Sequence, residues 1–240
     1  MPSEIEMLNA LKAFDTPSIT NVVATYPKNP LCLGLYNPWA MNWYTDASLR
    51  CWYPDMGPVV GYAVTCVYGL PDPNYSRLSF ADVIGAMEAS LQPTVFVFEQ
   101  RFPPEIANKV GLSGGNMTTA MQMAGCVGGI SNGPSRDIDE IRSMGFQYLT
   151  SGVCAGHGDM AIHAINVPVS VAGMDVAPGE IIHMDENGAV KFPAAYLADV
   201  LDRVTRLRDQ EAEHMARLRA AQSAAEVRAI LGGGHYGPKK

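Results

Sequence analysis

The residues best suited to chemistry lie in two glycine-rich segments near the middle of the chain. The first, Gly114–Met117, opens a short helical stretch, and the second is a Gly-Pro-Ser turn that places Arg136 beside Asp137. An arginine guanidinium binds a carboxylate through two parallel hydrogen bonds, and aspartate oxygens suit magnesium. Backbone amides at a helix start form an anion site that no side chain obstructs. We therefore expect the two segments to face each other across a small polar cleft.

A helix cap is the simpler alternative for the Arg-Asp pair. Asp137 is followed by Ile138, Asp139, Glu140 and Ile141, which fits acidic residues placed in the first turn of a helix. In that case the pair would stabilise a helix start and bind nothing. The glycine turn, helix, strand and Arg-Asp turn in one continuous run favour a site instead.

Further candidates for proton transfer or nucleophilic chemistry lie elsewhere in the chain. Glu99 ends an apolar run and is a candidate base, with a solvated strand end as the alternative. His157 is flanked by glycines and changes charge near neutral pH, so it is the leading acid–base candidate. Together with Asp159 and His163 it would suit zinc or iron, although a polar loop is the favoured interpretation. Cys154 is interpreted as a small packing thiol rather than a nucleophile.

Composition predicts one globular domain over residues 1–240. Of the 240 residues, 48% are hydrophobic and 17% charged, which suffices for a single well-packed core. The net charge of -7 argues against a nucleic-acid partner, which would require a basic stripe. The 5 cysteines show no CxxC spacing, which indicates reduced thiols. Neither a signal peptide nor a membrane-length apolar segment is evident, so we expect a cytoplasmic protein without a membrane partner.

Hydrophobic periodicity predicts strands that alternate with helices, which indicates an α/β fold. The expected helices are 5–14, 17–23, 79–87, a short one around Met121, 138–144 and a long C-terminal helical region over 194–232; the expected strands are 58–68, 95–99, 127–131, 148–151, 167–171, 180–184 and 189–192. The C-terminal region has an apolar stripe and then becomes charged and alanine-rich. A helix of this kind often docks on a neighbouring subunit.

Residues 31–56 form an aromatic-rich insertion loop. All 3 tryptophans of the chain, Trp39, Trp43 and Trp52, lie in this loop. Tryptophan favours both subunit interfaces and pocket walls, and here the interface is slightly preferred. The alternative is a loop that packs its aromatic side chains on its own core.

Two stretches resemble the RraA-like family: GGNMTTAMQMAGCVGGISNGPSRDIDEI at 114–141 and NVPVSVAGMDVAPGEIIHMDENGAVKFP at 166–193. This family contains the class II pyruvate aldolases acting on 4-hydroxy-4-methyl-2-oxoglutarate and the regulators of ribonuclease E activity. The resemblance implies a swivelling β/β/α-type domain with a mixed sheet core. It also implies a homo-oligomer, a trimer or hexamer, with sites near the subunit interfaces.

The resemblance also assigns roles to individual residues. By this likeness, Arg136 holds the keto-acid carboxylate, and Asp137 binds a divalent metal, Mg²⁺ or alternatively Mn²⁺. The turn Gly114–Met117 lines the anion site, which the amides of Asn116 and Met117 complete. The implied partner is therefore a small keto acid, bound with a metal cofactor.

The chain departs from the family pattern at two places. The family's acidic residue before the short helix is replaced by Gly115, and the usual Asp-Gly of the turn is Asn132-Gly133. Loss of an outer-shell carboxylate of this kind commonly lowers metal affinity or activity by about 10–100-fold. Glu99 is a candidate to supply the missing acid. In the aldolases a C-terminal glutamate reaches the next subunit's metal shell, and Glu211 or Glu213 is the candidate for that role.

These features predict a metal-dependent lyase that cleaves or decarboxylates a small hydroxy or keto acid through a pyruvate enolate. Arg136 would bind the carboxylate, a metal on Asp137 would polarise the keto oxygen, and Glu99 or His157 would act as base. One alternative is a non-catalytic regulator that binds a partner protein. Another is a hydratase, dehydratase or isomerase whose bulkier substrate is walled by the tryptophans of the insertion loop.

Overall fold

The computed structural model describes residues 2–26, 29–37, 39–74 and 77–232. Its helices are α1 (Glu4–Leu11), α2 (Thr16–Val23), α3 (Phe80–Glu88), α4 (Pro104–Ala107), α5 (Gly115–Met123), α6 (Ile138–Met144), α7 (Leu197–Ala220) and α8 (Ala224–Gly232), with 3-10 turns at Pro54–Met56 and Ala194–Tyr196. Its strands are β1 (Arg50–Cys51), β2 (Val59–Gly69), β3 (Thr94–Arg101), β4 (Cys126–Ser131), β5 (Gln147–Thr150), β6 (Ala161–Ile165), β7 (Val169–Val171), β8 (Met174–Val176), β9 (Ile181–Asp185) and β10 (Gly188–Phe192).

Eight of these strands form one mixed sheet. Its order is β1-β5-β4-β3-β2-β9-β10, and β6 also pairs with β2. The four central strands, β2 to β5, are mutually parallel, whereas the remaining pairs are antiparallel. Strand β2 is rich in β-branched residues and buried on both faces, as expected of a strand in a covered sheet. β7 and β8 form a separate hairpin.

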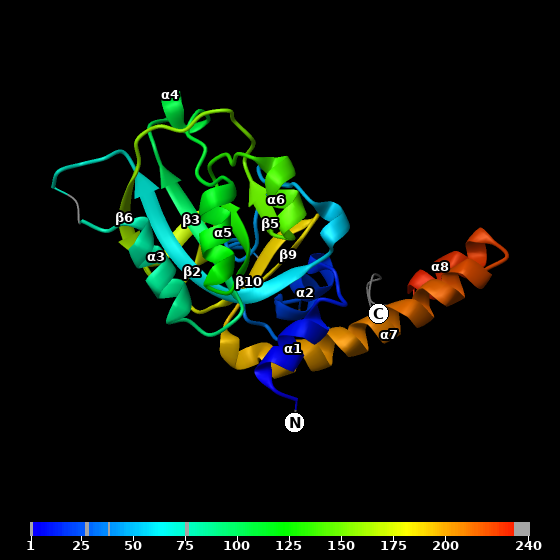
Figure 1. Ribbon diagram of the computed structural model, residues 1–240. Coiled ribbons are helices and arrows are strands. Elements are labelled where there is room, and N and C mark those ends of the chain that lie inside the picture. The colour runs from blue at the N-terminus through cyan, green and yellow to red at the C-terminus, as the bar shows by residue number, and fades with distance from the viewer. Residues whose placement is uncertain (1, 27–28, 38, 75–76, 233–240) are drawn as a thin grey trace.

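The sheet is covered on both faces, and the layers are visible in Figure 1. Helices α3, α5 and α6 pack over the parallel strands on one face, around Phe96 and Phe98. The β7–β8 hairpin packs on the other face, against Val95 and Val97. Helices α1, α2 and the first half of α7 cover β9 and β10 in a third cluster. The α/β class with a long C-terminal helix is thus confirmed.

Local signals account for several helix starts. Ser79 and Asp82 form a capping box at the start of α3, in which the Ser79 N–H and hydroxyl donate to Asp82 Oδ2 at 2.7 and 2.8 Å. Asp15 caps α2 by accepting a hydrogen bond from the Ser18 N–H at 3.0 Å. Each helix begins where the sequence predicts because these side chains satisfy amides that have no partner inside the helix.

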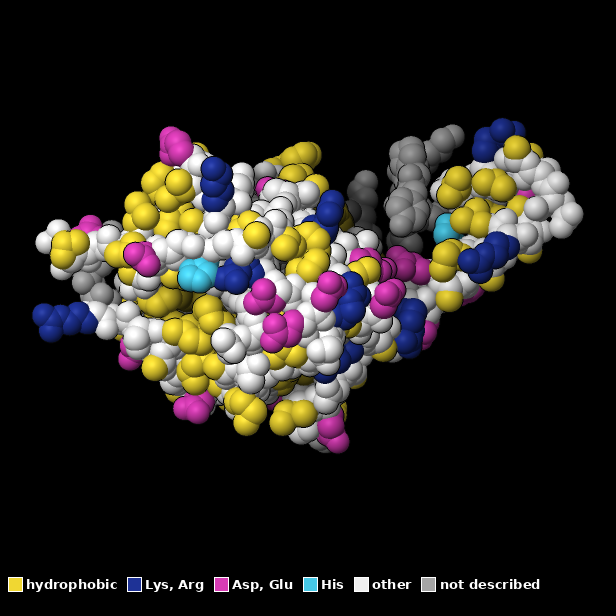
Figure 2. Space-filling view, turned by 45° about the horizontal axis from the view of Figure 1, so that its top comes forward, with side chains coloured by type: hydrophobic (Ala, Val, Ile, Leu, Met, Phe, Trp, Pro, Cys, Tyr) yellow, Lys and Arg dark blue, Asp and Glu magenta, His cyan; other side chains and the backbone are white. Residues whose placement is uncertain are grey.

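The structure departs from the predicted elements in the C-terminal part of the chain. Strand β6 occupies part of the expected polar loop around His163, and β8 begins at Met174, between the expected strands 167–171 and 180–184. The C-terminal region is not one continuous helix, because α7 ends at Ala220 and α8 starts at Ala224. In Figure 2 this C-terminal arm stands away from the body of the molecule. Within the described ranges, no helix combines the length and apolarity needed to cross a membrane.

The tryptophans of the insertion loop go to different places rather than to one pocket wall. Trp43 is 3% exposed and packs in the cluster beneath α1, α2 and α7, stacked on Tyr36 at 5.3 Å between ring centroids. Trp52 packs against the α3–α5–α6 cluster and donates its Nε1–H to Thr150. Trp39 is 86% exposed. The prediction that these three side chains enclose a bulky substrate is therefore wrong within the chain.

Candidate functional site

The start of α5 is held in place by a buried polar network. The Tyr148 hydroxyl on β5 contacts Ser113 Oγ at 2.6 Å and Thr118 Oγ1 at 3.0 Å. Burial raises the pKa of Tyr148, so the phenol stays protonated. Because Ser113 precedes the helix and Thr118 lies in its first turns, the network fixes the direction in which the amides at the start of α5 point.

The turn after β4 lies directly against this helix start, as the glycine-rich segments predict. The Arg136 N–H donates to Ser113 O at 3.1 Å, and Ser135 Oγ donates to the same carbonyl at 3.1 Å. On the other side of the turn, the Cys154 N–H donates to Ser135 O at 3.1 Å. The Arg-Asp turn is therefore enclosed between the loop before α5 and the loop after β5.

Asp137 does not cap its own helix. It has φ 54° and ψ 38°, in the left-handed region, and its side chain makes no capping hydrogen bond to α6. Its Oδ2 instead accepts a hydrogen bond from the Gly115 N–H at 3.2 Å, at the start of α5. A capping residue normally adopts an extended conformation, so this backbone strain directs the carboxylate away from α6 and towards α5. The Asp137 side chain therefore does not cap α6, but it accepts a hydrogen bond from the first amide of α5.

The start of α6 has its own support from the insertion loop. The Tyr53 hydroxyl donates to Ile138 O at 2.6 Å, and burial raises the pKa of Tyr53 to about 12, which keeps that hydroxyl a donor. The Arg142 guanidinium lies 5.0 Å from the centre of the Tyr53 ring. These contacts hold the start of α6 in position beside the start of α5, where Asp137 accepts the Gly115 N–H.

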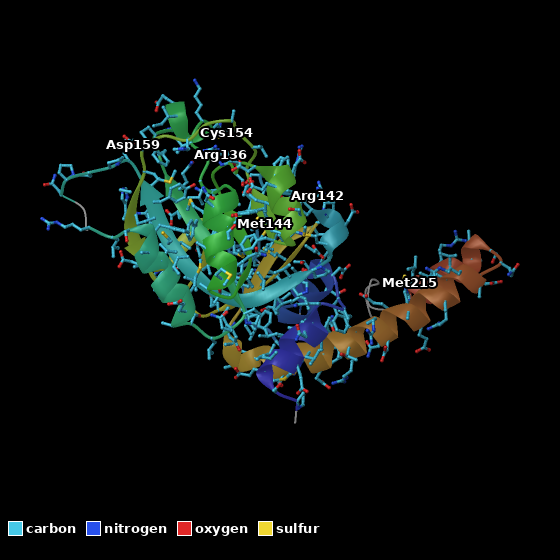
Figure 3. The ribbon with its side chains drawn as sticks, in the orientation of Figure 1. Arg136, Arg142, Met144, Cys154, Asp159 and Met215 are labelled. Carbon is cyan, nitrogen blue, oxygen red and sulfur yellow. The ribbon has the colours of Figure 1, made fainter. Side chains whose placement is uncertain are left out.

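Arg136 runs along the loop before α5. A Cβ at Gly111 would lie 2.5 Å from Arg136 Cγ, so only glycine leaves room for this side chain. The Arg136 Nε is buried and has no hydrogen-bond partner among the described residues. Figure 3 shows Arg136 beside Cys154 at the upper end of α5. A buried guanidinium N–H without a partner is a donor that a bound anion can satisfy.

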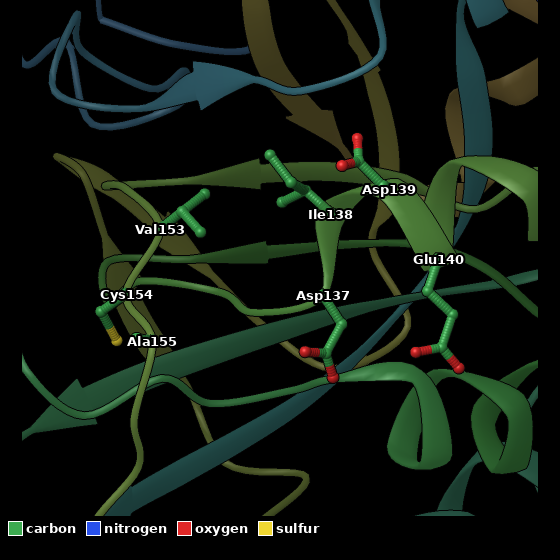
Figure 4. Close-up of a pocket in the computed structure, with 7 residues that line it drawn as sticks. All are labelled: Asp137, Ile138, Asp139, Glu140, Val153, Cys154 and Ala155. Carbon is green, nitrogen blue, oxygen red and sulfur yellow. The ribbon is translucent and has the colours of Figure 1, made fainter.

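Two glycines leave space for two carboxylates at the start of α5. A Cβ at Gly114 would lie 2.1 Å from Asp137 Oδ2, and a Cβ at Gly115 would lie 2.1 Å from Glu140 Oε1. Figure 4 shows the carboxylates of Asp137 and Glu140 directed to the same side, whereas that of Asp139 points away. Sequence reasoning placed Glu140 in a first helical turn and missed its position opposite Gly115.

These carboxylates border an open pocket of about 470 Å³. Its lining consists of Asp137, Ile138, Asp139, Glu140, Val153, Cys154 and Ala155. Among the described residues, none of the three acidic side chains of this pocket takes part in an ion pair. A pocket that carries several unpaired carboxylates has a local field that favours a cation.

The donor set fits a magnesium-type cation better than zinc. The described part of the chain contains no group of three His, Cys, Asp or Glu side chains able to enclose a metal. Magnesium is typically held by one or two carboxylates and completes its shell with water and substrate, whereas zinc sites use several nitrogen or sulfur ligands. The carboxylates of Asp137 and Glu140, in the space left by Gly114 and Gly115, match the one or two carboxylates that typically hold magnesium.

Glu99 lies away from this cleft. Phe96 and Phe98 face α5, and because side chains alternate along a strand, Glu99 points to the opposite face with Val97. There its carboxylate accepts hydrogen bonds from Arg101 Nε at 2.6 Å and from the N–H of Ser170 on β7 at 2.9 Å. The structure thus does not bring Glu99 to Gly115, where it was a candidate to supply a carboxylate.

The histidines after β5 do not form a cluster. His157 is exposed, and its Nδ1 lies 3.4 Å from Gly158 O. His163 lies on β6 with its Nε2 2.9 Å from Leu70 O, and Asp159 is exposed and well separated from Arg136 in Figure 3. The loop itself borders the site, because Gly156 O accepts the Gly111 N–H at 3.1 Å. His157 therefore remains a candidate base, and the zinc or iron cluster does not form.

Asn132 takes part in backbone pairing at the end of the sheet. Its Oδ1 accepts the Gln100 N–H at 2.6 Å, and its Nδ2 donates to Gln100 O at 3.1 Å. A carboxylate could accept the first bond but could not donate the second. This explains why an amide stands in the turn where the family usually has aspartate.

The C-terminal candidates lie on α7. Glu213 is exposed, whereas Glu211 is partly buried, and burial together with the negative charge of Asp15 raises the pKa of Glu211. Glu211 thus lies near Asp15, at the start of α2 of its own chain.

Curated relatives match part of the chain. An uncharacterized protein of Methanocaldococcus jannaschii is 26% identical over 115 residues, which are 48% of this chain and 55% of that protein. A putative 4-hydroxy-4-methyl-2-oxoglutarate aldolase of Halalkalibacterium halodurans is 29% identical over 109 residues, 45% of this chain and 50% of that protein. The chain thus spans about half the length of these relatives.

The fold is shared with a solved structure, RraAS2 of Streptomyces coelicolor, described as an unusual member of the RNase ES inhibitor RraA protein family. The two superpose with a TM-score of 0.64 at 18% identity, over 89% of this chain and 96% of that one. At this identity the likeness shows the fold alone. The sequence profile of the RraA-like family, described as Aldolase/RraA, matches residues 41–191, which include both the glycine turn before α5 and the Arg-Asp turn. The chain therefore belongs to the RraA-like family, which includes both aldolases and inhibitors of RNA processing.

Proposed function

We propose that the protein is a divalent-metal-dependent carbon–carbon lyase that cleaves or decarboxylates a small hydroxy or keto acid through a pyruvate enolate. The observation that carries this proposal is the conformation of Asp137, which is strained to reach across to α5 instead of capping α6. Strain of this kind is typical of functional sites, because the surrounding structure must hold it in place.

Arg136 is the group that would bind the substrate carboxylate. Its buried Nε has no partner among the described residues, and its stem is fixed against Gly111. The amides of Asn116 and Met117 lie in the first turn of α5, where helix geometry leaves them without intrahelical partners. Together with the positive end of the helix dipole they would stabilise negative charge on a substrate oxygen.

Asp137 would hold the cation, Mg²⁺ or Mn²⁺, opposite that helix end. The bound cation would supply positive charge that polarises the 2-keto oxygen. His157, exposed on the loop that packs against Gly111, is the candidate to accept the hydroxyl proton. We further propose that the protein works as a homo-oligomer, in which the C-terminal arm that stands off the body contacts another subunit.

The first test measures pyruvate release from 4-hydroxy-4-methyl-2-oxoglutarate and from oxaloacetate, with Mg²⁺ and after chelation, with the enzyme-free rate subtracted. Asp137→Asn keeps a residue that tolerates the left-handed conformation and removes the charge. We expect it to lower the metal-dependent rate by about 100-fold.

Asp139→Asn is the matched control, because it removes the same charge from the same pocket but from a carboxylate that points away. It should retain activity within about twofold, since its carboxylate points away from the start of α5 and makes no contact with Gly115. Equal rates in the wild type and Asp137→Asn would refute the proposal. No release from either substrate by the folded wild type would favour the protein-binding regulator.

A further inference from the structure

Three buried hydroxyl groups beneath the start of α5 form a chain of hydrogen bonds with one direction. Thr118 Oγ1 donates to Gly114 O at 2.9 Å, because a carbonyl only accepts. A hydroxyl has one proton, so Thr118 accepts its second contact, at 3.0 Å, from the Tyr148 phenol. The phenol proton is then used, and the Ser113 hydroxyl must donate to Tyr148, at 2.6 Å. The chain therefore runs from Ser113 through Tyr148 and Thr118 to the carbonyl that precedes α5.

This hydroxyl chain is closed to solvent. Ser113 and Thr118 are 0% exposed, and Tyr148 is 1% exposed. A buried hydroxyl that loses its partner retains the full cost of its desolvation. Loss of the phenol oxygen would leave the Ser113 hydroxyl without an acceptor and Thr118 without a donor. The segments that carry these two side chains would then have to move to find new partners.

Ser113 connects the hydroxyl chain to the Arg-Asp turn. Its carbonyl accepts the Arg136 N–H and the Ser135 hydroxyl, each at 3.1 Å. Thr118 connects the same chain to α5, where its own N–H begins the helical hydrogen bonding. The Tyr148 phenol thus lies between the two segments whose donors would bind an anion.

Both of these segments carry free donors. The amides of Asn116 and Met117 have no acceptor within the helix, and the Arg136 Nε is buried without a partner among the described residues. One carboxylate can accept from both segments only where the distance and angle between them suit it. Donors that are already held in that geometry need no reorganisation when the anion binds.

We propose that Tyr148 is a positioning residue of this anion site: its hydroxyl ties the loop before α5 to the helix and thereby sets where Arg136 lies relative to the free amides. Because Tyr148 is buried, it acts through Ser113 and Thr118 rather than by touching the anion. The assignment rests on the proposed function in one respect, since the anion is taken to be the carboxylate of the keto acid. It gives a role to a phenol that neither glycine-rich segment contains.

The test measures the affinity of the full chain for oxalate, a planar analogue of the pyruvate enolate, by isothermal titration calorimetry with Mg²⁺ present. Tyr148→Phe removes only the phenol oxygen, and we expect it to weaken oxalate binding about tenfold, because small displacements of positioned groups have effects of at least this size. Tyr62→Phe is the matched control. It removes the hydroxyl of another buried tyrosine, which donates to Glu4 Oε2 at 3.0 Å outside the site, and it should bind oxalate within about twofold of the wild type.

Further substitutions separate positioning from packing. Thr118→Val keeps the shape of the side chain and should weaken oxalate binding about as much as Tyr148→Phe, whereas Thr118→Ser keeps the hydroxyl and should stay within about threefold of the wild type. Ser113→Ala, added to Tyr148→Phe, removes the hydroxyl that has lost its acceptor, so urea unfolding should show a recovery of stability. Oxalate affinity should not recover, because the link to α5 is still missing. Circular dichroism and elution volume establish that each variant is folded.

Oxalate affinity unchanged in Tyr148→Phe would overturn the assignment, as would a wild type that binds no oxalate at millimolar concentration. Equal weakening in Tyr148→Phe and Tyr62→Phe, or an affinity that recovers with stability in the double variant, would show a structural role alone. Oxalate binding that depends on Tyr148, without any pyruvate release by the wild type, would overturn the lyase proposal and leave the assignment of Tyr148 intact. Pyruvate release that depends on Asp137 but not on Tyr148 would have the opposite meaning.

Discussion

At the scale of single residues, Asn132 replaces the carboxylate that the family usually has in this turn with an amide that makes two backbone hydrogen bonds. Its amide pairs with both backbone groups of Gln100 and so continues the contact between β3 and β4 beyond the last regular pair. The turn that delivers Arg136 begins immediately after this link. The position of the Arg136 guanidinium therefore depends on the Asn132 amide, although the two groups are not in contact.

Asn132→Asp should accordingly destabilise the fold. The aspartate would lose the donor to Gln100 O and place a carboxylate oxygen against that carbonyl, which we expect to lower the free energy of unfolding by about 2 kcal/mol. Urea unfolding measures this value. Asn108→Asp, at an exposed position, introduces the same charge and should change the stability by less than about 0.5 kcal/mol; similar losses in both variants would contradict the structural role of Asn132.

The sequence located Arg136, Asp137 and the glycine turn because all three belong to one continuous run. It could not locate Glu140, because the approach of α6 to α5 is a property of the tertiary fold. A signal was nevertheless present: Gly115 stands at the start of a helix where neither a turn nor a positive φ requires glycine. Only the structure shows that the end of the Glu140 side chain lies beside Gly115.

At the scale of elements, a buried polar cluster ties α1 and α2 to the sheet. The N–H of Thr16 donates to Asp185 Oδ2 at 2.7 Å, and its hydroxyl lies 2.9 Å from His183 Nδ1. His183 Nε2 lies 3.2 Å from Leu11 O. Since a carbonyl only accepts, Nε2 carries a proton, and because burial favours the neutral ring, Nδ1 accepts from the Thr16 hydroxyl.

This cluster predicts a loss of stability in mild acid. Burial lowers the pKa of His183 from its ordinary value of 6.5. Below that pH the unfolded chain binds a proton that the folded chain does not bind, so acidification favours unfolding. Between pH 7.5 and 5.5 the wild type should lose about 1 kcal/mol more unfolding free energy than His183→Gln. Urea titrations at both pH values measure the difference, and equal losses in the two proteins would exclude this role for His183.

Elements with a strong local pattern were predicted closely, and elements that depend on their neighbours were not. Helix α6 has the predicted bounds, and β2 lies within one residue of its predicted bounds. β6 and β8 are short and partly exposed, so their pairing with β2 and β7, rather than their own composition, makes them strands. The break between α7 and α8 contains neither glycine nor proline, but Ser223 followed three residues later by Glu226 is a helix-start signal that we missed: the Glu226 N–H donates to Ser223 Oγ at 3.2 Å.

At the scale of the whole molecule, α7 divides into a packed half and a free half. Val200, Val204 and Leu207 are buried against α1 and α2, whereas Met215 is 45% exposed on the arm. The helix has 24 residues, so it is about 36 Å long, and its second half extends beyond the body (Figure 2). Within one chain, the packing that stabilises α7 must therefore come from the first half of the helix.

Two substitutions on this helix should differ accordingly. Val204→Ala removes methyl groups from a fully buried site and should cost about 2 kcal/mol of unfolding free energy. Met215→Ala should change the stability of the chain by less than about 0.5 kcal/mol, because alanine favours helix and nothing is uncovered. Unfolding monitored at several protein concentrations provides the measurement. A loss in Met215→Ala that disappears on dilution would show that the arm packs on another subunit, as proposed.

The position of β2 determines how the molecule opens. This strand pairs with β3 along one edge and with β9 and then β6 along the other, and it is buried on both faces. Its amides can exchange hydrogen with solvent only when the whole sheet comes apart, whereas the outer turns of α7 can open alone. The loops that carry the site extend from β4 and β5 of the same sheet. The protein can therefore fluctuate widely at its arm while the supports of Arg136 and Asp137 remain closed.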